Sequence, residues 1–228
     1  MSNVFLFSVF PYLAVLLAVA GGIYRGVRLR DTLTARSSQL LESRLQGFGA
    51  VPWHAAILLI LTAHVLAAFF PQAFAHILGA PARLYALELV GLALGMLAIA
   101  GIATLIVRRF SLTQATSAMD WLVLASLALQ AVTGVYVALV LRWGSGWFLH
   151  TGAPWLASLA RLDPHIDEIA MLPFVVKLHF LNAFVLIALL PLSRLIHIVT
   201  VPLSYLWRPP QLVSWRPAPA NGHAPRAG

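Results

Sequence analysis

The chain has 228 residues, of which 61% are hydrophobic and 10% are charged, and its mean hydropathy is +0.87. A soluble domain carries about 25% charged residues, so this composition predicts an all-α integral membrane protein. The net charge of +8 does not indicate nucleic-acid binding, because the basic residues lie between apolar runs. Cysteine is absent, which excludes disulfides, cysteine-ligated iron–sulfur clusters and covalently attached haem.

Five apolar segments reach the length of about 20 residues that crosses a membrane. In chain order they are 3–24, 52–70, 84–107, 119–141 and 173–200. In the first segment the arginines follow the apolar run, whereas a cleaved signal peptide has them before it. We therefore expect five transmembrane helices, with the first one retained and its amino terminus outside.

The 15 Lys and Arg residues are divided unequally between the two sides of these spans. One side carries Arg25, Arg28, Arg30, Arg36, Arg44, Arg108, Arg109, Arg194, Arg208, Arg216 and Arg226. The other carries Arg83, Arg142, Arg161 and Lys177, with the acidic Asp163, Asp167 and Glu168. Because cytoplasmic loops hold the excess of basic residues, the carboxyl terminus is expected in the cytoplasm.

Four of the eight histidines lie within spans: His54 and His64 in the second, His179 and His197 in the fifth. A single such ring could be a hydrogen-bonding residue between helices, but four on two helices favour function, because polar groups are costly in a membrane. A spacing of eighteen residues places His179 and His197 on one face of a continuous helix, about 27 Å apart along its axis. His54 and His64 are ten residues apart, which is about 15 Å along the axis.

The second and fifth spans run antiparallel, so His54 is expected opposite His197 near the cytoplasm, and His64 opposite His179 further out. Two imidazoles do not supply the four ligands of a zinc site. Haem iron takes only axial ligands from the protein, and two opposed neutral imidazoles suit it, provided that the helices cross at an angle. We predict two haems b at different depths, which form an electron path across the membrane.

The remaining histidines fall in loops or in the tail, where we expect them to be solvated: His76, His150, His165 and His223. The aromatic loop 142–172 is expected on the outer membrane surface, because tryptophan prefers the interface. The stretch 209–228 contains five prolines, so we expect a Pro-rich cytoplasmic tail, disordered or partner-bound, after a membrane domain at 1–208.

Several other polar residues have two readings. Arg108 and Arg109 could pair with haem propionates or act as positive-inside anchors. Arg194, one turn before His197, could also pair with a propionate, or it could simply extend its charged end to the membrane surface. Asp120 follows Ser117 with the spacing of a capping box, which explains it without a functional role. Two further patterns concern packing: Gln130 and Thr133 are expected to hydrogen-bond between helices, and GLALGMLAIAG (91–101) predicts close helix contact.

Three blocks of sequence resemble one known family. They are RSSQLLE (36–42), PWHAAILLILTAHVLAAFFP (52–71), and the pair KLHFLNAF (177–184) with PLSRLIHIVTVPLSYLWRPPQLV (191–213). With the spacings H-x9-H and H-x17-H, they are similar to the gamma subunit of membrane-bound respiratory nitrate reductases, the di-haem cytochrome b that anchors the complex. The resemblance extends over almost the whole chain.

The resemblance implies the same pairing, His54 with His197 on the cytoplasmic side and His64 with His179 on the outer side. It implies that quinol is oxidised near the outer haem, and that electrons pass to an iron–sulfur beta subunit and a molybdenum alpha subunit in the cytoplasm. The bacterial or archaeal inner membrane is the implied location. Beside the histidine that matches His64, the family has glycines where this chain has Ala63 and Ala67. The family also has a lysine in the outer loop near the quinol. No residue of this chain clearly matches that lysine, and Arg83 is the nearest cation.

Two alternatives follow from the residues. A related di-haem cytochrome b could serve a heterodisulfide- or sulfite-reductase-like partner, because the haem helices would be the same. A transporter or structural anchor could instead use the histidines to line a pore. In either case the chain alone should not reduce nitrate, because it has no ligands for molybdenum or iron–sulfur centres.

Overall fold

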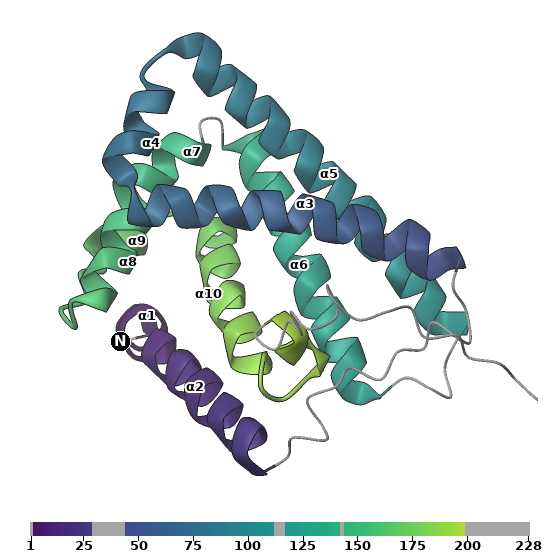
Figure 1. The fold of residues 1–228 in the computed structure, drawn as a ribbon. Helices are drawn as coiled ribbons and strands as arrows, with labels where there is room; N and C mark the ends of the chain where they lie inside the picture. Colours follow the sequence, from purple (N-terminus) through teal and green to yellow (C-terminus); the bar gives the residue numbers. More distant parts are fainter. Residues whose placement is uncertain (1, 29–43, 112–116, 142–143, 199–228) are drawn as a thin grey trace, which may run out of the picture.

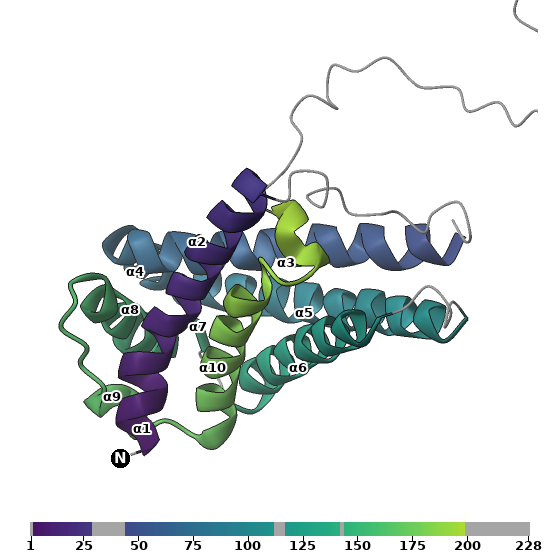
Figure 2. The same cartoon turned by 90° about the horizontal axis from the view of Figure 1, so that it is seen from below.

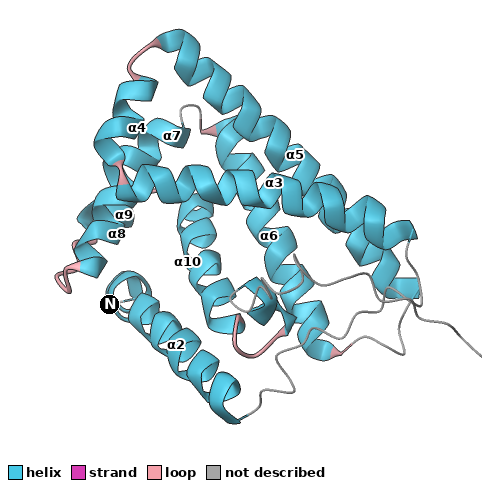
Figure 3. Ribbon diagram, in the orientation of Figure 1, coloured by secondary structure: helices cyan, strands magenta, loops and turns pink. Residues whose placement is uncertain are grey.

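The structure, a computed structural model, describes residues 2–28, 44–111, 117–141 and 144–198, with the side chains of 2, 44–47, 111, Glu168 and His197 not described. In this part of the chain every regular element is helical (Figure 3), so the all-α prediction is confirmed there. Outside the described residues lie the block 36–42, Arg30, Arg36, Arg142, Arg208, Arg216, His223, Arg226 and the tail 209–228.

The elements follow one another along the chain as shown in Figure 1. They are α1 (Ser2–Val4), the π-helical turn η1 (Phe5–Val9), α2 (Phe10–Arg28), α3 (Arg44–Phe69), α4 (Pro71–Leu78), α5 (Pro81–Ser111), α6 (Ala118–Val140), α7 (Gly144–Trp147), the π-helical turn η4 (Phe148–Gly152), α8 (Ala153–Ala160), α9 (Asp167–Ala170), α10 (Phe174–Leu189) and the 3₁₀ turn η5 (Arg194–Ile198).

Four stretches of the described chain are helical, long and apolar enough to cross a membrane. They are Phe5–Arg28, Phe48–Phe69, Pro81–Phe110 and Ala118–Val140. Large apolar side chains on them remain exposed, among them Leu16, Leu59 and Leu89, as expected of helices that face lipid. The chain is thus a multi-pass membrane protein, and the first four predicted spans have the required length and composition.

The fifth predicted span is interrupted, so the expectation of one continuous helix through 200 is wrong. Helix α10 ends at Leu189, and Leu190 and Leu192 then bond three residues back, to Ile187 and Leu189. Pro191 explains the break, because proline has no N–H to donate and its ring clashes with the carbonyl four residues earlier. His197 lies in η5 beyond the break, and the calculation that placed it on one face with His179 therefore does not apply.

The helices pack in a series. Helix α3 lies along α5, α5 against α6, α6 against α10, and α10 against α2. In both Figure 1 and Figure 2, α2 and α10 are side by side, while α4, α8 and α9 gather at one end of the molecule. Helix α3 ends at Phe69 and α10 begins at Phe174 at this end of the molecule. It is therefore the side predicted to be outside.

The segment 144–172, predicted to lie outside, packs against η1 and α10. Trp155, expected at the membrane surface, is instead buried at 2% exposure among Phe7, Phe180 and Phe184. Its Nε1 donates to the Phe7 carbonyl at 3.0 Å. This carbonyl is four residues before Pro11, which has no N–H to offer it. The indole N–H of Trp155 therefore supplies the hydrogen bond that Pro11 cannot give to the Phe7 carbonyl.

The close packing predicted for 91–101 is confirmed at its end. A Cβ added to Gly101 would lie 2.8 Å from the backbone nitrogen of Trp53 and 3.0 Å from the carbonyl oxygen of Gly49. These backbone atoms belong to α3, so α3 and α5 approach each other too closely for any side chain at this position.

Gly101→Ala is expected to lower the free energy of unfolding by about 1–3 kcal/mol, because the added methyl group must push two backbones apart. Gly91→Ala is the matched control, since a Cβ at Gly91, on the same helix, meets nothing within 4 Å. Thermal unfolding in detergent measures both variants. Equal midpoints for the two variants would contradict the close approach.

Candidate functional site

His54 and His64 lie on the exposed surface of α3 and hold their rings in the same way. In each case Nδ1 is bonded to the backbone carbonyl four residues earlier: Ala50 at 2.7 Å for His54 and Ile60 at 2.8 Å for His64. A carbonyl oxygen only accepts, so Nδ1 must carry the proton and Nε2 the lone pair. Metal-ligating histidines commonly have this arrangement, with the second ring nitrogen donating to a carbonyl.

His179 on α10 is held by two residues of α6. Its Nδ1 lies 2.9 Å from Oγ1 of Thr133, and its Nε2 lies 3.1 Å from Nε2 of Gln130. The Thr133 hydroxyl donates its hydrogen to the carbonyl of Leu129 at 2.7 Å, so it accepts from Nδ1–H of the imidazole. The prediction that Gln130 and Thr133 bond between helices is therefore confirmed.

Asn182 fixes which way the Gln130 amide points. It donates to Oε1 of Gln130 at 2.7 Å and to the carbonyl of Ser126 at 2.9 Å. The NH₂ group of Gln130 is thereby turned toward His179, whose Nε2 must accept. His179 consequently has the same tautomer as His54 and His64, with the lone pair on Nε2.

Residues of other elements lie beside the rings of His64 and His179. Phe148 of η4 has its ring centroid 5.5 Å from that of His64. A Cβ at Gly134 would lie 3.1 Å from Cε1 of His179, so the absence of a side chain at Gly134 leaves room for this ring. Sequence reasoning did not identify Phe148 or Gly134 as part of the site.

His197 is placed by its backbone in η5, and its side chain is not described. Its pairing with His54 stays a prediction. Three of the loop histidines, His76, His150 and His165, are exposed as predicted.

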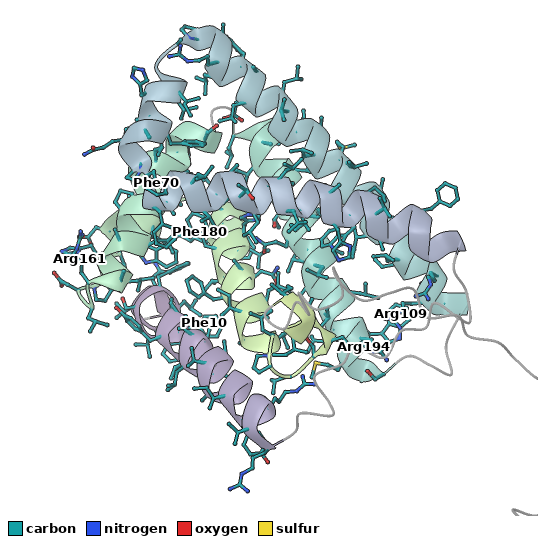
Figure 4. The ribbon with its side chains drawn as sticks, in the orientation of Figure 1. Phe10, Phe70, Arg109, Arg161, Phe180 and Arg194 are labelled. Atoms are coloured by element: carbon teal, nitrogen blue, oxygen red, sulfur yellow. The ribbon has the colours of Figure 1, made fainter. Side chains whose placement is uncertain are left out.

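The three arginines predicted to lie on the cytoplasmic side are at the end of α5 and in η5, and two of them lie near the start of α6. Asp120 links two of them: its Oδ1 lies 3.2 Å from Nε of Arg194, and its Oδ2 lies 3.9 Å from Nη1 of Arg109. Figure 4 shows Arg109 and Arg194 approaching each other there. Arg108 is also buried, with 4% of its surface exposed. The sequence did not predict that Asp120 is a counter-ion to these arginines.

The capping box at the start of α6 is confirmed. Oδ2 of Asp120 accepts from the backbone N–H of Ser117 at 3.0 Å, while Oγ of Ser117 accepts from the backbone N–H of Asp120 at 3.2 Å. Asp120 is 7% exposed. Its carboxylate therefore caps the helix, as predicted, and also pairs with arginines, which was not predicted.

At the opposite end, which was predicted to be outside, three charged residues bind groups of the folded segments. Arg83 donates to the carbonyls of Ile77 and His76 at 2.9 and 3.0 Å, at the end of α4. Lys177 donates to the carbonyl of Ala170 at 2.6 Å. Glu88 accepts from the backbone N–H of Ser145 at 2.9 Å and from its hydroxyl. These contacts join the outer loops to α5 and α10.

A haem b fits this set of donors. In the described part of the chain, His, Cys, Asp and Glu side chains do not gather in groups of three or more that could hold a metal ion directly. A porphyrin iron needs only axial ligands. His54 and His64 have Nε2 as the nitrogen that would bind it, whereas Nε2 of His179 accepts from the Gln130 amide and would exchange this bond for one to the iron. Arg109 adds a buried Nη1 without a hydrogen-bond partner among the described residues, which suits a carboxylate such as a haem propionate.

Comparison with known proteins identifies the family. The model of the nitrate reductase gamma subunit family matches residues 3–216. The chain is 28% identical to the nitrate reductase gamma chain of Bacillus subtilis, covering 91% of this chain and 96% of that one. It is 29% identical to the respiratory nitrate reductase 1 gamma chain of Escherichia coli, over 94% and 98%.

A third relative is the nitrate reductase-like protein NarX of Mycobacterium tuberculosis, 30% identical over 89% of this chain and 32% of that longer protein. The resemblance found in the blocks around the four histidines is thus confirmed over nearly the full length. The chain belongs to the nitrate reductase gamma subunit family and is a membrane subunit of a multi-subunit nitrate reductase.

Proposed function

We propose that the chain is the quinol-oxidising electron-transfer subunit of a respiratory nitrate reductase. His64 and His179 would hold one haem b toward the outer side, and His54 and His197 a second one toward the cytoplasm. When bound, haem b supplies one-electron redox chemistry, which converts the two-electron oxidation of a quinol into single-electron transfers. The observation that carries the proposal is the common tautomer of His54, His64 and His179, with Nδ1 engaged and Nε2 as the acceptor nitrogen.

The proposed topology has five crossings, with the amino terminus outside and the carboxyl terminus in the cytoplasm of a bacterial or archaeal cell, in its inner membrane. Helix α10 has 16 residues, about 24 Å of rise, against a hydrocarbon core of about 30 Å. The turn after Leu189 and η5 would complete the fifth crossing.

The electron acceptor is proposed to be an iron–sulfur beta subunit that feeds a molybdenum alpha subunit on the cytoplasmic side. The arginines at the end of α5 and in η5 support this orientation, since basic residues accumulate on the cytoplasmic side. We assign Arg108, Arg109 and Arg194 to the propionates of the inner haem. Two positive guanidinium groups around one carboxylate at Asp120 leave a net positive charge there, which a propionate would offset.

Quinol is proposed to bind near His64, where η4 and α8 cover the outer end of the helices. The quinol protons would then be released outside, while electrons are consumed inside, so that the step separates charge. Arg83, the nearest cation in the sequence, is bonded to the end of α4, and its role there is accounted for by these carbonyls.

Thr133→Val is expected to weaken retention of the outer haem by about 10- to 100-fold, the usual effect of losing a partner of a ligating histidine. The valine keeps the shape but not the hydroxyl that accepts from Nδ1 of His179. Transfer of haem to an excess of apo-globin measures the loss. Thr133→Ser keeps the hydroxyl and is the control; identical transfer from both variants would rule out this role.

The function as a whole is tested by adding a quinol analogue to the purified complex in lipid vesicles. We expect b-type absorption bands to appear on reduction, and to disappear when nitrate is added. A chain that has no b-type bands, or bands that quinol cannot reduce, would overturn the proposal. The former result would favour a non-redox anchor.

A further inference from the structure

Helix α10 is followed by a break, and the segment after it is held from two sides. Ser193 is 6% exposed and Ile196 is 3% exposed, although this short segment has only a 3₁₀ turn. Oγ of Ser193 donates to the carbonyl of Leu189 at 2.7 Å and accepts from the backbone N–H of Leu195 at 3.1 Å. These local bonds bend the chain, but they do not attach it to the other helices.

The first attachment comes from α2. Nη1 of Arg25 donates to the carbonyls of Pro191 and Ser193 at 2.8 and 3.1 Å. Both carbonyls lie after the last turn of α10, which ends at Leu189. A Cβ added to Gly21, one turn before Arg25, would lie 2.7 Å from Cβ of Pro191. Helix α2 therefore lies directly against the break and satisfies its backbone.

The second attachment comes from α6, through the contact of Asp120 with Arg194. Arg194 is the first residue of η5, and His197 is three residues further on. Asp120 is fixed in turn by the capping box with Ser117 and by its position near Arg109. One buried carboxylate thus joins the start of α6, the end of α5 and the turn that carries His197.

We propose that Asp120 is a positioning residue for His197, acting through Arg194. Because the proline break uncouples η5 from α10, the position of η5, and of the His197 backbone within it, is not set by the helix that carries His179. The contact of Asp120 with Arg194 sets this position instead, and Arg25 holds the backbone on the other side. This inference rests on the proposed function, since it concerns the placement of the inner haem ligand.

The test is electron paramagnetic resonance of the oxidised complex, in which each low-spin haem has its own signal. The inner signal is the one missing from His54→Ala. Asp120→Asn keeps the shape and an acceptor for Ser117 but loses the charge that holds Arg194. We expect the inner signal to shift or broaden in this variant, the outer signal to remain as in the wild type, and Asp120→Glu to restore the inner signal at least in part.

Glu88→Gln is the matched control, because it neutralises a carboxylate that also accepts from a helix start, but at the outer end. It should leave the inner signal unchanged. Two unchanged signals in Asp120→Asn would overturn the inference, and so would equal loss of both, which would mean that Asp120 only supports the fold. A wild-type complex without two haem signals would refute the proposed function itself, a result distinct from either of these.

Discussion

His64→Ala is expected to leave one haem b per chain instead of two and to abolish quinol oxidation. The imidazole is one of two axial ligands proposed for the outer haem, and no other described histidine of α3 lies near His179. The haem-to-protein ratio from a pyridine haemochrome assay, together with quinol-dependent nitrate reduction by the complex, measures the outcome. Activity should fall to background, because the group nearest the quinol is missing.

His76→Ala serves as its control, since His76 lies in α4 at the same end of the molecule and its ring is exposed. It should retain two haems and most of the activity. A His64→Ala complex with full haem content would show that the exposed ring on α3 is not a ligand.

His54→Ala is expected to have the same haem loss but a different kinetic result. The outer pair, His64 and His179, is intact in this variant, so quinol should still reduce the remaining haem. The electrons should not reach nitrate, because the inner group that connects to the partner is gone. Stopped-flow spectra therefore should show b-type bands that quinol reduces and that nitrate does not reoxidise.

The contrast between the two variants carries the information. If His54→Ala and His64→Ala gave indistinguishable spectra and kinetics, the assignment of the histidines to two depths would be wrong. The corresponding partners, His197→Ala and His179→Ala, should reproduce the behaviour of His54→Ala and His64→Ala respectively.

Features that depend on short-range pattern were predictable from the sequence. The apolar runs gave the first four spans, and the spacing of Ser117 and Asp120 gave the capping box. The small residues at 91–101 indicated close packing against another helix, and Gly101 makes such a contact with α3. In each of these cases the residues that interact lie a few positions apart, or the composition of a single helix decides the outcome.

Features that depend on contacts between distant segments were not predictable. The stretch 173–200 was predicted as one span, but it breaks at Pro191, and the break is stabilised by Arg25, more than 160 residues away. Trp155 was expected at the interface, but its N–H satisfies the carbonyl that Pro11 leaves without a donor. The capping box with Ser117 already explained Asp120 from the local sequence, so its contact with Arg194 was not predicted.

The same distinction applies to the site. The positions of His54 and His64 on one helix followed from the sequence, whereas the fixation of His179 by Gln130 and Thr133 required the approach of α6 to α10. A polar residue on each of two apolar helices could suggest such a bond, but the sequence alone did not determine which partners meet.

The most direct measurement is the haem content and ligation of the purified, assembled wild-type complex. Low-temperature spectroscopy combined with a haemochrome assay should find two low-spin b-type haems for each copy of this chain, both with two imidazole ligands. A complex that carries no haem on this chain, or whose haems have other axial ligands, would contradict the account.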